Sequence, residues 1–163
     1  MHYQVSDVSL HLGTGLAVVL DMGGVRLLVV DDEALVCWAI ERAAVRQQAH
    51  VRIAPTGAEA IACIGESPYD VAFIDIHLPD INGLELLAQL RILSPATKFV
   101  VLTSDATPGN RERAYARGAW QFIEKPFDLS EVGLLLDECA HHREGRRAQA
   151  KAVPDSRTGG SPG

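Results

Sequence analysis

Five side chains capable of polar chemistry stand at the ends of apolar runs in the sequence. Asp31 and Asp32 come directly after one run, Asp75 ends another, and Thr103 and Lys125 close two more. Three carboxylates in one crevice would repel each other, so they need protonation or a bound cation. Carboxylate-rich ligation suits a hard ion, and Mg²⁺ fits a site that keeps waters and admits phosphate. Carboxylates, metal, hydroxyl and ammonium together make a phosphoryl-transfer site, in which one carboxylate can be the nucleophile.

These side chains meet only if the intervening elements bring them together. Apolar runs alternate with amphipathic stretches, which predicts strands over 25–30, 50–54, 69–74, 98–102 and 120–123 and helices over 33–47, 56–64, 83–93, 108–117 and 129–141. Strict alternation implies a parallel sheet with helices on both faces and right-handed crossovers. We expect an α/β, flavodoxin-like (βα)5 doubly wound sheet of strand order 2-1-3-4-5 in three α/β/α layers. That order makes strands one and three neighbours at the ligand-binding edge.

Length and composition exclude several classes of protein. A chain of 163 residues with 47% hydrophobic and 22% charged residues is neither disordered nor fibrous. No apolar run approaches the roughly 20 residues that span a bilayer, and no Lys/Arg cluster opens the chain as in a secretory signal. The three widely spaced cysteines favour a reducing compartment over a disulfide framework or a zinc site. We therefore expect a cytoplasmic protein with no membrane partner.

Charge divides the chain into unequal parts. Within a net charge of −6, residues 1–140 carry 10 Lys/Arg against 19 Asp/Glu, and residues 141–163 carry 5 against 2. The acidic body repels a phosphate backbone, so no direct nucleic-acid binding is expected. We expect residues 1–24 to be an N-terminal extension without a core role, 25–142 to be the domain, and 143–163 to be a basic and then Gly/Pro/Ser-rich disordered tail.

Four segments carry a resemblance to a known family. They are VVDDE at 29–33, IDIHLPDING at 74–83, LTS at 102–104 and EKPF at 124–127. Each is weak alone, but all four in this order and at compatible spacings are specific. Over residues 25–141 the sequence resembles a CheY-like response-regulator receiver domain of two-component signalling.

The resemblance implies how the acidic residues would work. Asp75 would be the phosphoacceptor, taking a phosphoryl group from a sensor histidine kinase or a histidine phosphotransfer protein. Asp32 would bind Mg²⁺ directly and Asp31 through water, while Asp75 and the backbone carbonyl of His77 would complete the protein ligands. The protein would then be no enzyme beyond phosphorylating and dephosphorylating itself at Asp75.

The resemblance also implies a route for the signal to a downstream protein target. Lys125 would pair with the phosphoryl oxygens, and the Thr103 hydroxyl would hydrogen-bond to them in the active state. Phe122 falls where the family has an aromatic switch residue, although a core role is the competing interpretation. A phosphorylation-dependent homodimer is a further expectation.

One face of the first predicted helix has no obvious internal partner. Leu35 and Trp38 share it with Arg42 and Arg46, away from the apolar stripe. In receivers this helix lies where the phosphodonor docks, so we expect Leu35 and Trp38 to contact it. In the competing interpretation Trp38 covers residues 1–24 or the last helix.

Proteins of other classes share parts of this pattern. A flavodoxin-like electron carrier would need a Ser/Thr/Gly phosphate loop where this chain has three acidic residues. A haloacid-dehalogenase-type phosphatase would want an Asp at position 77, which is His. A receiver-like interaction module working without phosphorylation stays open. So does a receiver fragment of a longer transcription regulator or hybrid kinase, although we expect a stand-alone receiver because about 20 residues follow the last predicted helix, too few for a helix-turn-helix domain.

Overall fold

The computed structural model describes residues 23–151, with side chains as far as residue 145. Five parallel strands form one sheet in the order β2-β1-β3-β4-β5, which confirms the predicted topology. The strands are β1 Arg26–Val30, β2 His50–Ala54, β3 Val71–Asp75, β4 Lys98–Thr103 and β5 Gln121–Glu124. The helices are α1 Ala34–Arg46, α2 Gly57–Glu66, α3 Gly83–Leu93, α4 Pro108–Ala116 and α5 Leu129–Lys151.

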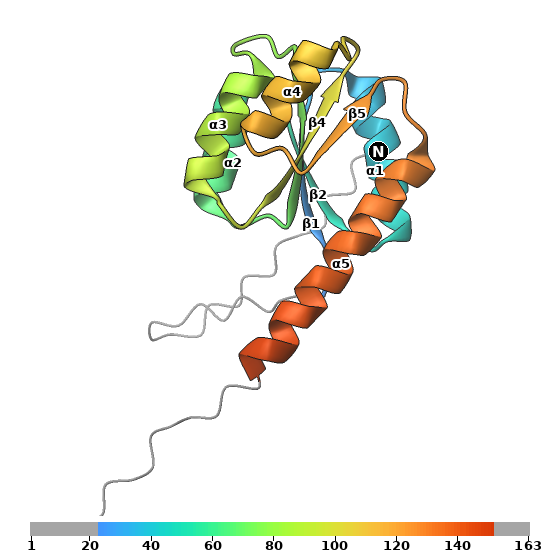
Figure 1. Ribbon diagram of the computed structural model, residues 1–163. Helices are drawn as coiled ribbons and strands as arrows, with labels where there is room; N and C mark the ends of the chain where they lie inside the picture. Colours follow the sequence, from blue (N-terminus) through green and yellow to red (C-terminus); the bar gives the residue numbers. More distant parts are fainter. Residues whose placement is uncertain (1–22, 152–163) are drawn as a thin grey trace, which may run out of the picture.

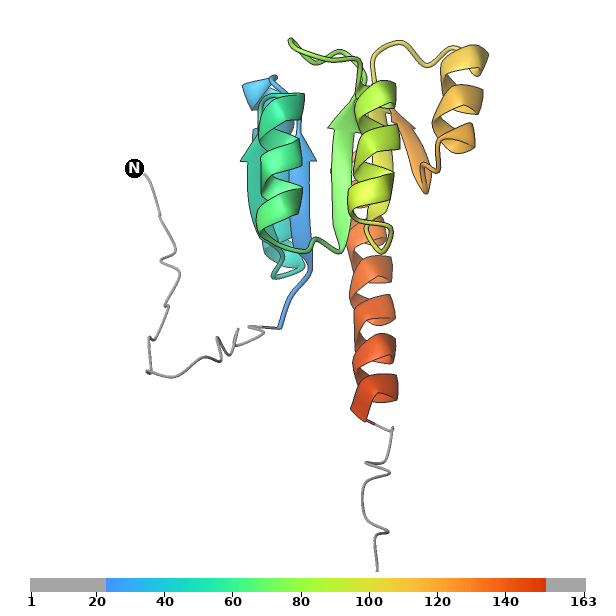
Figure 2. The ribbon, with the colours of Figure 1, turned by 90° about the vertical axis from the view of Figure 1, so that its left-hand side faces the viewer.

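The helices cover both faces of the sheet, as strict β–α alternation requires. Figure 1 shows α2, α3 and α4 on one side of the strands and α1 and α5 on the other. In Figure 2 α2 and α3 lie in front of the sheet, and α5 continues past its lower edge. Among the described helices, none combines the length and the apolar character needed to cross a bilayer.

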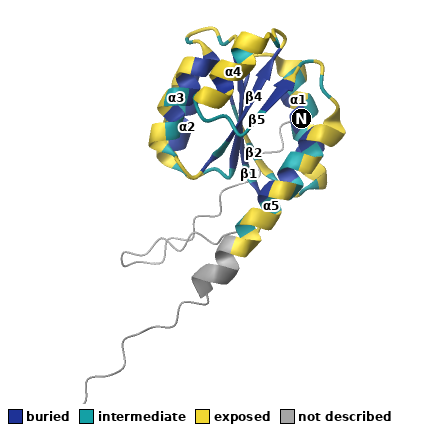
Figure 3. Ribbon diagram, viewed as in Figure 1, coloured by how far each residue is buried: buried dark blue, intermediate teal, exposed yellow. Residues whose placement is uncertain are grey.

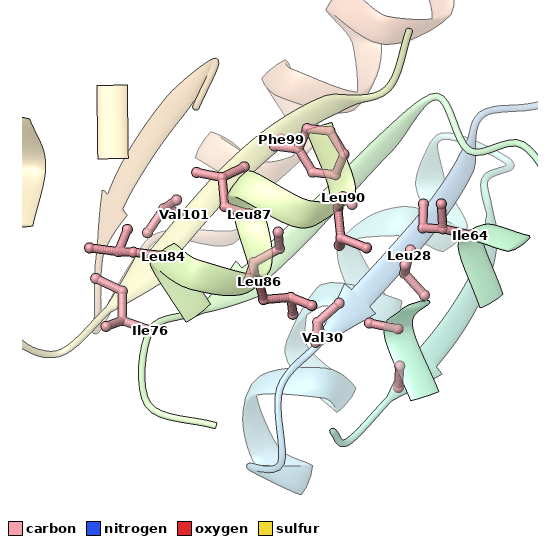
Figure 4. Close-up of a cluster of buried hydrophobic side chains, with 14 of the residues drawn as sticks. Leu28, Val30, Ile64, Ile76, Leu84, Leu86, Leu87, Leu90, Phe99 and Val101 are labelled. Atoms are coloured by element: carbon pink, nitrogen blue, oxygen red, sulfur yellow. The ribbon is translucent and has the colours of Figure 1, made fainter. Parts of the chain in front are cut away.

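The central strands are buried because both of their faces pack against helices. Along β1, Leu28 and Val30 join one apolar cluster, while Leu27 and Val29 join the other. Every residue of β3 is buried. Figure 3 shows this buried centre with exposed outer helix faces, and Figure 4 shows the cluster on the α2–α3 side around Leu28, Phe99 and Leu90. Such continuous burial explains why these strands read as unbroken apolar runs.

Predicted and observed element bounds differ mostly by one or two residues. The exception is α5, which was predicted to end at residue 141 and continues to Lys151. Residues 143–151, which the prediction placed outside the domain as the basic part of the tail, are therefore helical. No proline interrupts this stretch, and Arg143 anchors it by donating to the Gly24 carbonyl and to Asp70 Oδ2. The predictions for residues 1–22 and 152–163 lie outside the described residues.

Gly83 provides a test of the packing at the carboxyl edge of the sheet. A Cβ atom there would overlap the backbone carbonyl of Asp75, whereas a Cβ at Gly65 on α2 would meet nothing within 4 Å. We expect Gly83→Ala to lower the free energy of unfolding by about 1–3 kcal/mol or more, through overpacking. Gly65→Ala should instead raise it by about 0.5–1 kcal/mol, because alanine favours the helix.

Urea unfolding of both variants beside wild type checks this pair. Equal stability of Gly83→Ala and wild type would contradict the close approach of α3 to the end of β3.

Candidate phosphoryl-transfer site

Three carboxylates meet at the carboxyl edge of the sheet, as the strand order predicted. Asp31 and Asp32 follow β1 and Asp75 ends β3, and these two strands pair in register through Val30 and Ile74. One oxygen atom from each of the three carboxylates lies within 4.8 Å of the others. Asp31 and Asp75 are buried, whereas Asp32 is exposed. Two carboxylates of the cluster are thus buried, and the third is open to solvent.

Lys125 reaches this cluster from the end of β5. Its Nζ lies 2.7 Å from Asp31 Oδ2, 2.8 Å from Glu33 Oε1 and 3.2 Å from Asp75 Oδ1. The backbone N–H of Lys125 also donates to the Thr103 carbonyl at 2.8 Å, which ties the lysine to the end of β4. The contact between Lys125 and Glu33 was not predicted from the sequence. The run of three acidic residues after β1 was the signal that could have indicated it.

Burial and neighbouring charges have opposite effects on the pKa values of Asp31 and Lys125. Burial raises the pKa of Asp31, and its hydrogen bonds from Lys125 and from the Glu33 N–H offset this only in part. Burial by itself would lower the pKa of Lys125, but the hydrogen bonds to Asp31 and Glu33 and the charges of Asp31 and Asp75 raise it. The lysine therefore stays protonated, and the carboxylates carry more negative charge than this one cation neutralises.

The donor set of the cluster fits a hard divalent cation. It offers three carboxylate oxygens and no sulfur or imidazole ligand, which is the chemistry that Mg²⁺ and Ca²⁺ prefer. The exposed position of Asp32 leaves room for the waters that such an ion keeps.

The loop after β3 is fastened next to Asp75. His77 donates its backbone N–H to Asp75 Oδ2 at 3.1 Å, and its side chain is exposed. The Gly83 N–H donates to the Ile76 carbonyl at 2.8 Å, and His77 and Asn82 form an isolated bridge across the loop. The start of the loop is thus held beside the Asp75 carboxylate through the His77 N–H.

Thr103 ends β4 beside Asp75 but is engaged elsewhere. Its side chain is buried, and its hydroxyl oxygen accepts the Asp105 N–H at 2.9 Å. Asp105 in turn accepts two hydrogen bonds from Asn110 Nδ2, at 3.0 Å to its carbonyl and 3.1 Å to Oδ2. Thr103 is therefore connected to the first turn of α4.

Phe122 points into the protein in this structure. It is 6% exposed and belongs to the apolar cluster on the α2–α3 side. The guanidinium of Arg111 on α4 lies over its ring, 4.7 Å from the centroid. The packing fits both of the earlier interpretations, a core residue and the inward position of a switch. The stacked arginine had no signature in the sequence.

Leu35 and Trp38 are left uncovered on α1. They are 75% and 53% exposed, and Arg42 lies 5.6 Å from the centroid of the Trp38 ring. The α1 residues in the apolar cluster shared with α5 include Ile40 and Ala44, which lie on another face. About half of the Trp38 side chain is thus left open to solvent by the described residues.

Comparison with known proteins agrees with this geometry. Residues 27–136 match the family model of the response regulator receiver domain. The DNA-binding transcriptional regulator NtrC of Escherichia coli K12 is 30% identical over 114 residues, covering 70% of this chain and 24% of the relative. The transcriptional regulatory protein TcrA of Mycobacterium tuberculosis is 32% identical over 111 residues, covering 68% of this chain and 44% of the relative. The chain thus spans about a quarter of the NtrC protein's length and under half of TcrA's.

Solved structures show the same fold. A CheY-like receiver domain protein of Methanospirillum hungatei aligns with a TM-score of 0.69 at 29% identity, covering 74% of this chain and 97% of that one. A response regulator of Burkholderia pseudomallei, solved with a phosphorylated aspartic acid, a calcium ion and citrate, aligns with a TM-score of 0.65 at 27% identity, covering 78% and 75%. The family match, the strand order and the acidic cluster agree, and the chain belongs to the response-regulator receiver domains of two-component signalling.

Proposed function

We propose that Asp75 accepts a phosphoryl group from a phosphohistidine donor, with Mg²⁺ held by Asp31, Asp32, Asp75 and the backbone carbonyl of His77. The observation that carries this proposal is that the Asp75 carboxylate lies within 4.8 Å of the two carboxylates after β1 and 3.2 Å from the Lys125 ammonium, which also contacts Asp31. Asp75 is largely buried, and it ends β3 at the ligand-binding edge of a doubly wound sheet.

The residues present account for each part of the transfer. One Asp75 oxygen attacks phosphorus, the P–N bond breaks, and its electron pair leaves with the donor's imidazole. Mg²⁺, when bound, neutralises charge on the transferring group. The Lys125 ammonium lies 3.2 Å from Asp75 Oδ1, so it is close enough to pair with the oxygens of a phosphoryl group on Asp75.

We propose that the signal leaves the site through Thr103 and Phe122. A phosphoryl group adds nearly two negative charges and strong acceptor oxygens at Asp75. The Thr103 hydroxyl would turn to donate to it and release the Asp105 N–H, which now holds the loop before α4. Because Asn110 connects this loop to α4 and Arg111 lies over Phe122, the change would reach the surface of α4 and β5.

The partners we propose are proteins. A sensor histidine kinase or histidine phosphotransfer protein would dock over α1, where Leu35 and Trp38 are exposed beside the site. A downstream protein target, or a second copy of the chain, would read the α4–β5 surface. The acidic charge of the domain speaks against direct nucleic-acid contact. The described cysteines are all free, which suits the reducing cytoplasm that we propose as its location.

Asp75→Asn should abolish phosphorylation, because the amide keeps the shape of the side chain but is not a nucleophile. Incubation with a small acyl phosphate and Mg²⁺, followed by intact-mass spectrometry, should show one added phosphoryl group in wild type and none in the variant. Asp137→Asn on α5 is the control and should behave as wild type. Labelling of Asp75→Asn at the wild-type rate would show that another residue is the acceptor.

Asp32→Asn should weaken Mg²⁺ binding about tenfold or more, since one of three charged ligands is lost. Titration calorimetry on the unphosphorylated protein measures this affinity directly. Glu124→Gln removes an exposed carboxylate at the same edge of the sheet, outside the cluster, and should leave the affinity within about twofold of wild type. Equal affinity of Asp32→Asn and wild type would exclude Asp32 as a ligand.

Thr103→Ala should separate phosphorylation from the response of Phe122. With 4-fluorophenylalanine at position 122, the ¹⁹F signal of the otherwise unchanged protein should shift when a beryllofluoride mimic binds with Mg²⁺. In Thr103→Ala the mimic should still bind, but the ¹⁹F shift should be lost. Thr103→Ser keeps the hydroxyl and should restore it. Equal ¹⁹F shifts in the alanine variant and in the parent would exclude Thr103 as the link.

A further inference from the structure

Asp80 forms a contact between two distant parts of the chain. It lies at the tip of the β3–α3 loop, yet its two carboxylate oxygens accept the backbone N–H groups of Gly57 and Ala58, both at 2.9 Å. These groups open helix α2, more than 20 residues earlier in the chain. Figure 2 shows the loop reaching over the top of α2. The hydrogen bonds from Gly57 and Ala58 also lower the pKa of Asp80, so it is ionised at neutral pH.

The contact completes the N-terminus of α2. Thr56 caps its own helix, because its hydroxyl accepts the Glu59 N–H at 3.2 Å and its carbonyl accepts the Ala60 N–H at 3.0 Å. Thr56 does not accept a hydrogen bond from the N–H groups of Gly57 and Ala58, which have no acceptor within the first turn of the helix. Asp80 accepts both, with its charge at the positive end of the helix dipole. The loop therefore has a specific attachment point on α2.

Gly57 makes this close approach sterically feasible. A Cβ atom there would overlap the Ile81 side chain and lie 3.5 Å from both Asp80 oxygens. Ile81 packs against the same apolar cluster as α2 and α3. An apolar contact and a charged double hydrogen bond thus fix the loop tip at one place.

The other end of this loop is the phosphorylation site. His77, whose backbone carbonyl we propose as a metal ligand, lies three residues before Asp80 and two after Asp75. The His77 N–H already donates to Asp75 Oδ2 at 3.1 Å, and the Gly83 N–H closes the base of the loop. Between these points Pro79, Asp80 and Asn82 are exposed, and only Leu78 and Ile81 pack partly against the apolar cluster, so the hydrogen bonds of Asp80 add a polar attachment to these apolar contacts.

We infer that Asp80 is a positioning residue for the metal site: by fastening the β3–α3 loop to the start of α2, it fixes the His77 backbone relative to Asp75. This inference rests on the proposed function. Its physical basis is that a cation site of few protein ligands loses affinity when one ligand is free to move. Changes in groups that orient metal ligands typically weaken binding by about 10–100-fold.

A second exposed aspartate provides the matched control. Asp128, in the loop before α5, accepts from the N–H and the hydroxyl of Ser130, both at 2.8 Å, and its pKa is likewise lowered by these bonds. The hydrogen bonds of the Asp128 carboxylate come from Ser130, two residues away, and not from the start of α2. Asp80→Ala and Asp128→Ala each remove an exposed, helix-capping carboxylate, but only the first removes an attachment of the β3–α3 loop.

The experiment measures the Mg²⁺ dissociation constant by calorimetry and stability by urea unfolding, for wild type, Asp80→Ala, Asp80→Asn and Asp128→Ala. We expect Asp80→Ala to weaken Mg²⁺ binding by about tenfold, and Asp80→Asn, which keeps one acceptor oxygen, to weaken it less. Asp128→Ala should be destabilised to a similar extent as Asp80→Ala and keep the wild-type Mg²⁺ affinity. If Asp80→Ala fails to fold, the comparison of Asp80→Asn with Asp128→Asn decides the question in the same way.

A phosphorylation assay with a small acyl phosphate separates this inference from the proposed function. At limiting Mg²⁺ Asp80→Ala should be labelled about tenfold more slowly than wild type, and saturating Mg²⁺ should restore its rate. Unchanged Mg²⁺ affinity in both Asp80 variants would overturn the positioning role, whatever their stability. If wild type takes no label, the proposed phosphoacceptor function fails, and the Mg²⁺ titrations still decide the role of Asp80.

Discussion

The repulsion among carboxylates at one edge of the sheet is the constraint on which the rest of the site depends. Asp31 and Asp75 are buried side by side, and Lys125 reaches both. Removing one partner of such a buried group typically costs about 3–5 kcal/mol, because the remaining charge is uncompensated. One ammonium cannot neutralise three aspartates and Glu33, so the folded protein keeps a negative site at this edge. A divalent cation and then a transferring phosphoryl group are the natural occupants.

The sheet is what keeps this unfavourable arrangement in place. β1, β3 and β4 are buried between two helical layers, and their backbone hydrogen bonds keep them in register. The ends of these strands therefore keep fixed positions relative to one another. The close approach of Gly83 to the Asp75 carbonyl extends this rigidity to the start of α3. The apolar core therefore supports like charges that would separate in a looser structure.

The loops above the sheet make a different use of hydrogen bonds. The β3–α3 loop is attached to the start of α2 by Asp80, and the β4–α4 loop is held by the hydrogen bond from the Asp105 N–H to the Thr103 hydroxyl. The first attachment lies outside the carboxylate cluster, while the second uses the hydroxyl that, in our proposal, turns toward a phosphoryl group. The β3–α3 loop, fastened away from the carboxylates, can keep a metal ligand in one position. The β4–α4 loop, fastened by the Thr103 hydroxyl, can change its conformation when that hydroxyl turns.

Much of the site was determined by the sequence alone. Apolar runs ending at Asp31, Asp75, Thr103 and Lys125 predicted both the strands and the polar residues at one edge, because alternating strands and helices allow few topologies. The Thr56 cap of α2 is a local interaction, since Thr56 and Glu59 are neighbours in the chain. The attachment of α5 near residue 143 could not be predicted from the sequence, because Arg143 binds Gly24 and Asp70, which precede other strands.

Only the tertiary structure decided which partners the remaining side chains have. Glu33 contacts Lys125 across 92 residues, Asp80 reaches Gly57 across 23, and Arg111 lies over Phe122 from a different element. These contacts depend on the paths of loops and on side-chain rotamers, neither of which leaves a periodic trace in the sequence. Periodicity and strand-end chemistry determine where a site forms, and packing between distant segments determines which residues hold it in shape.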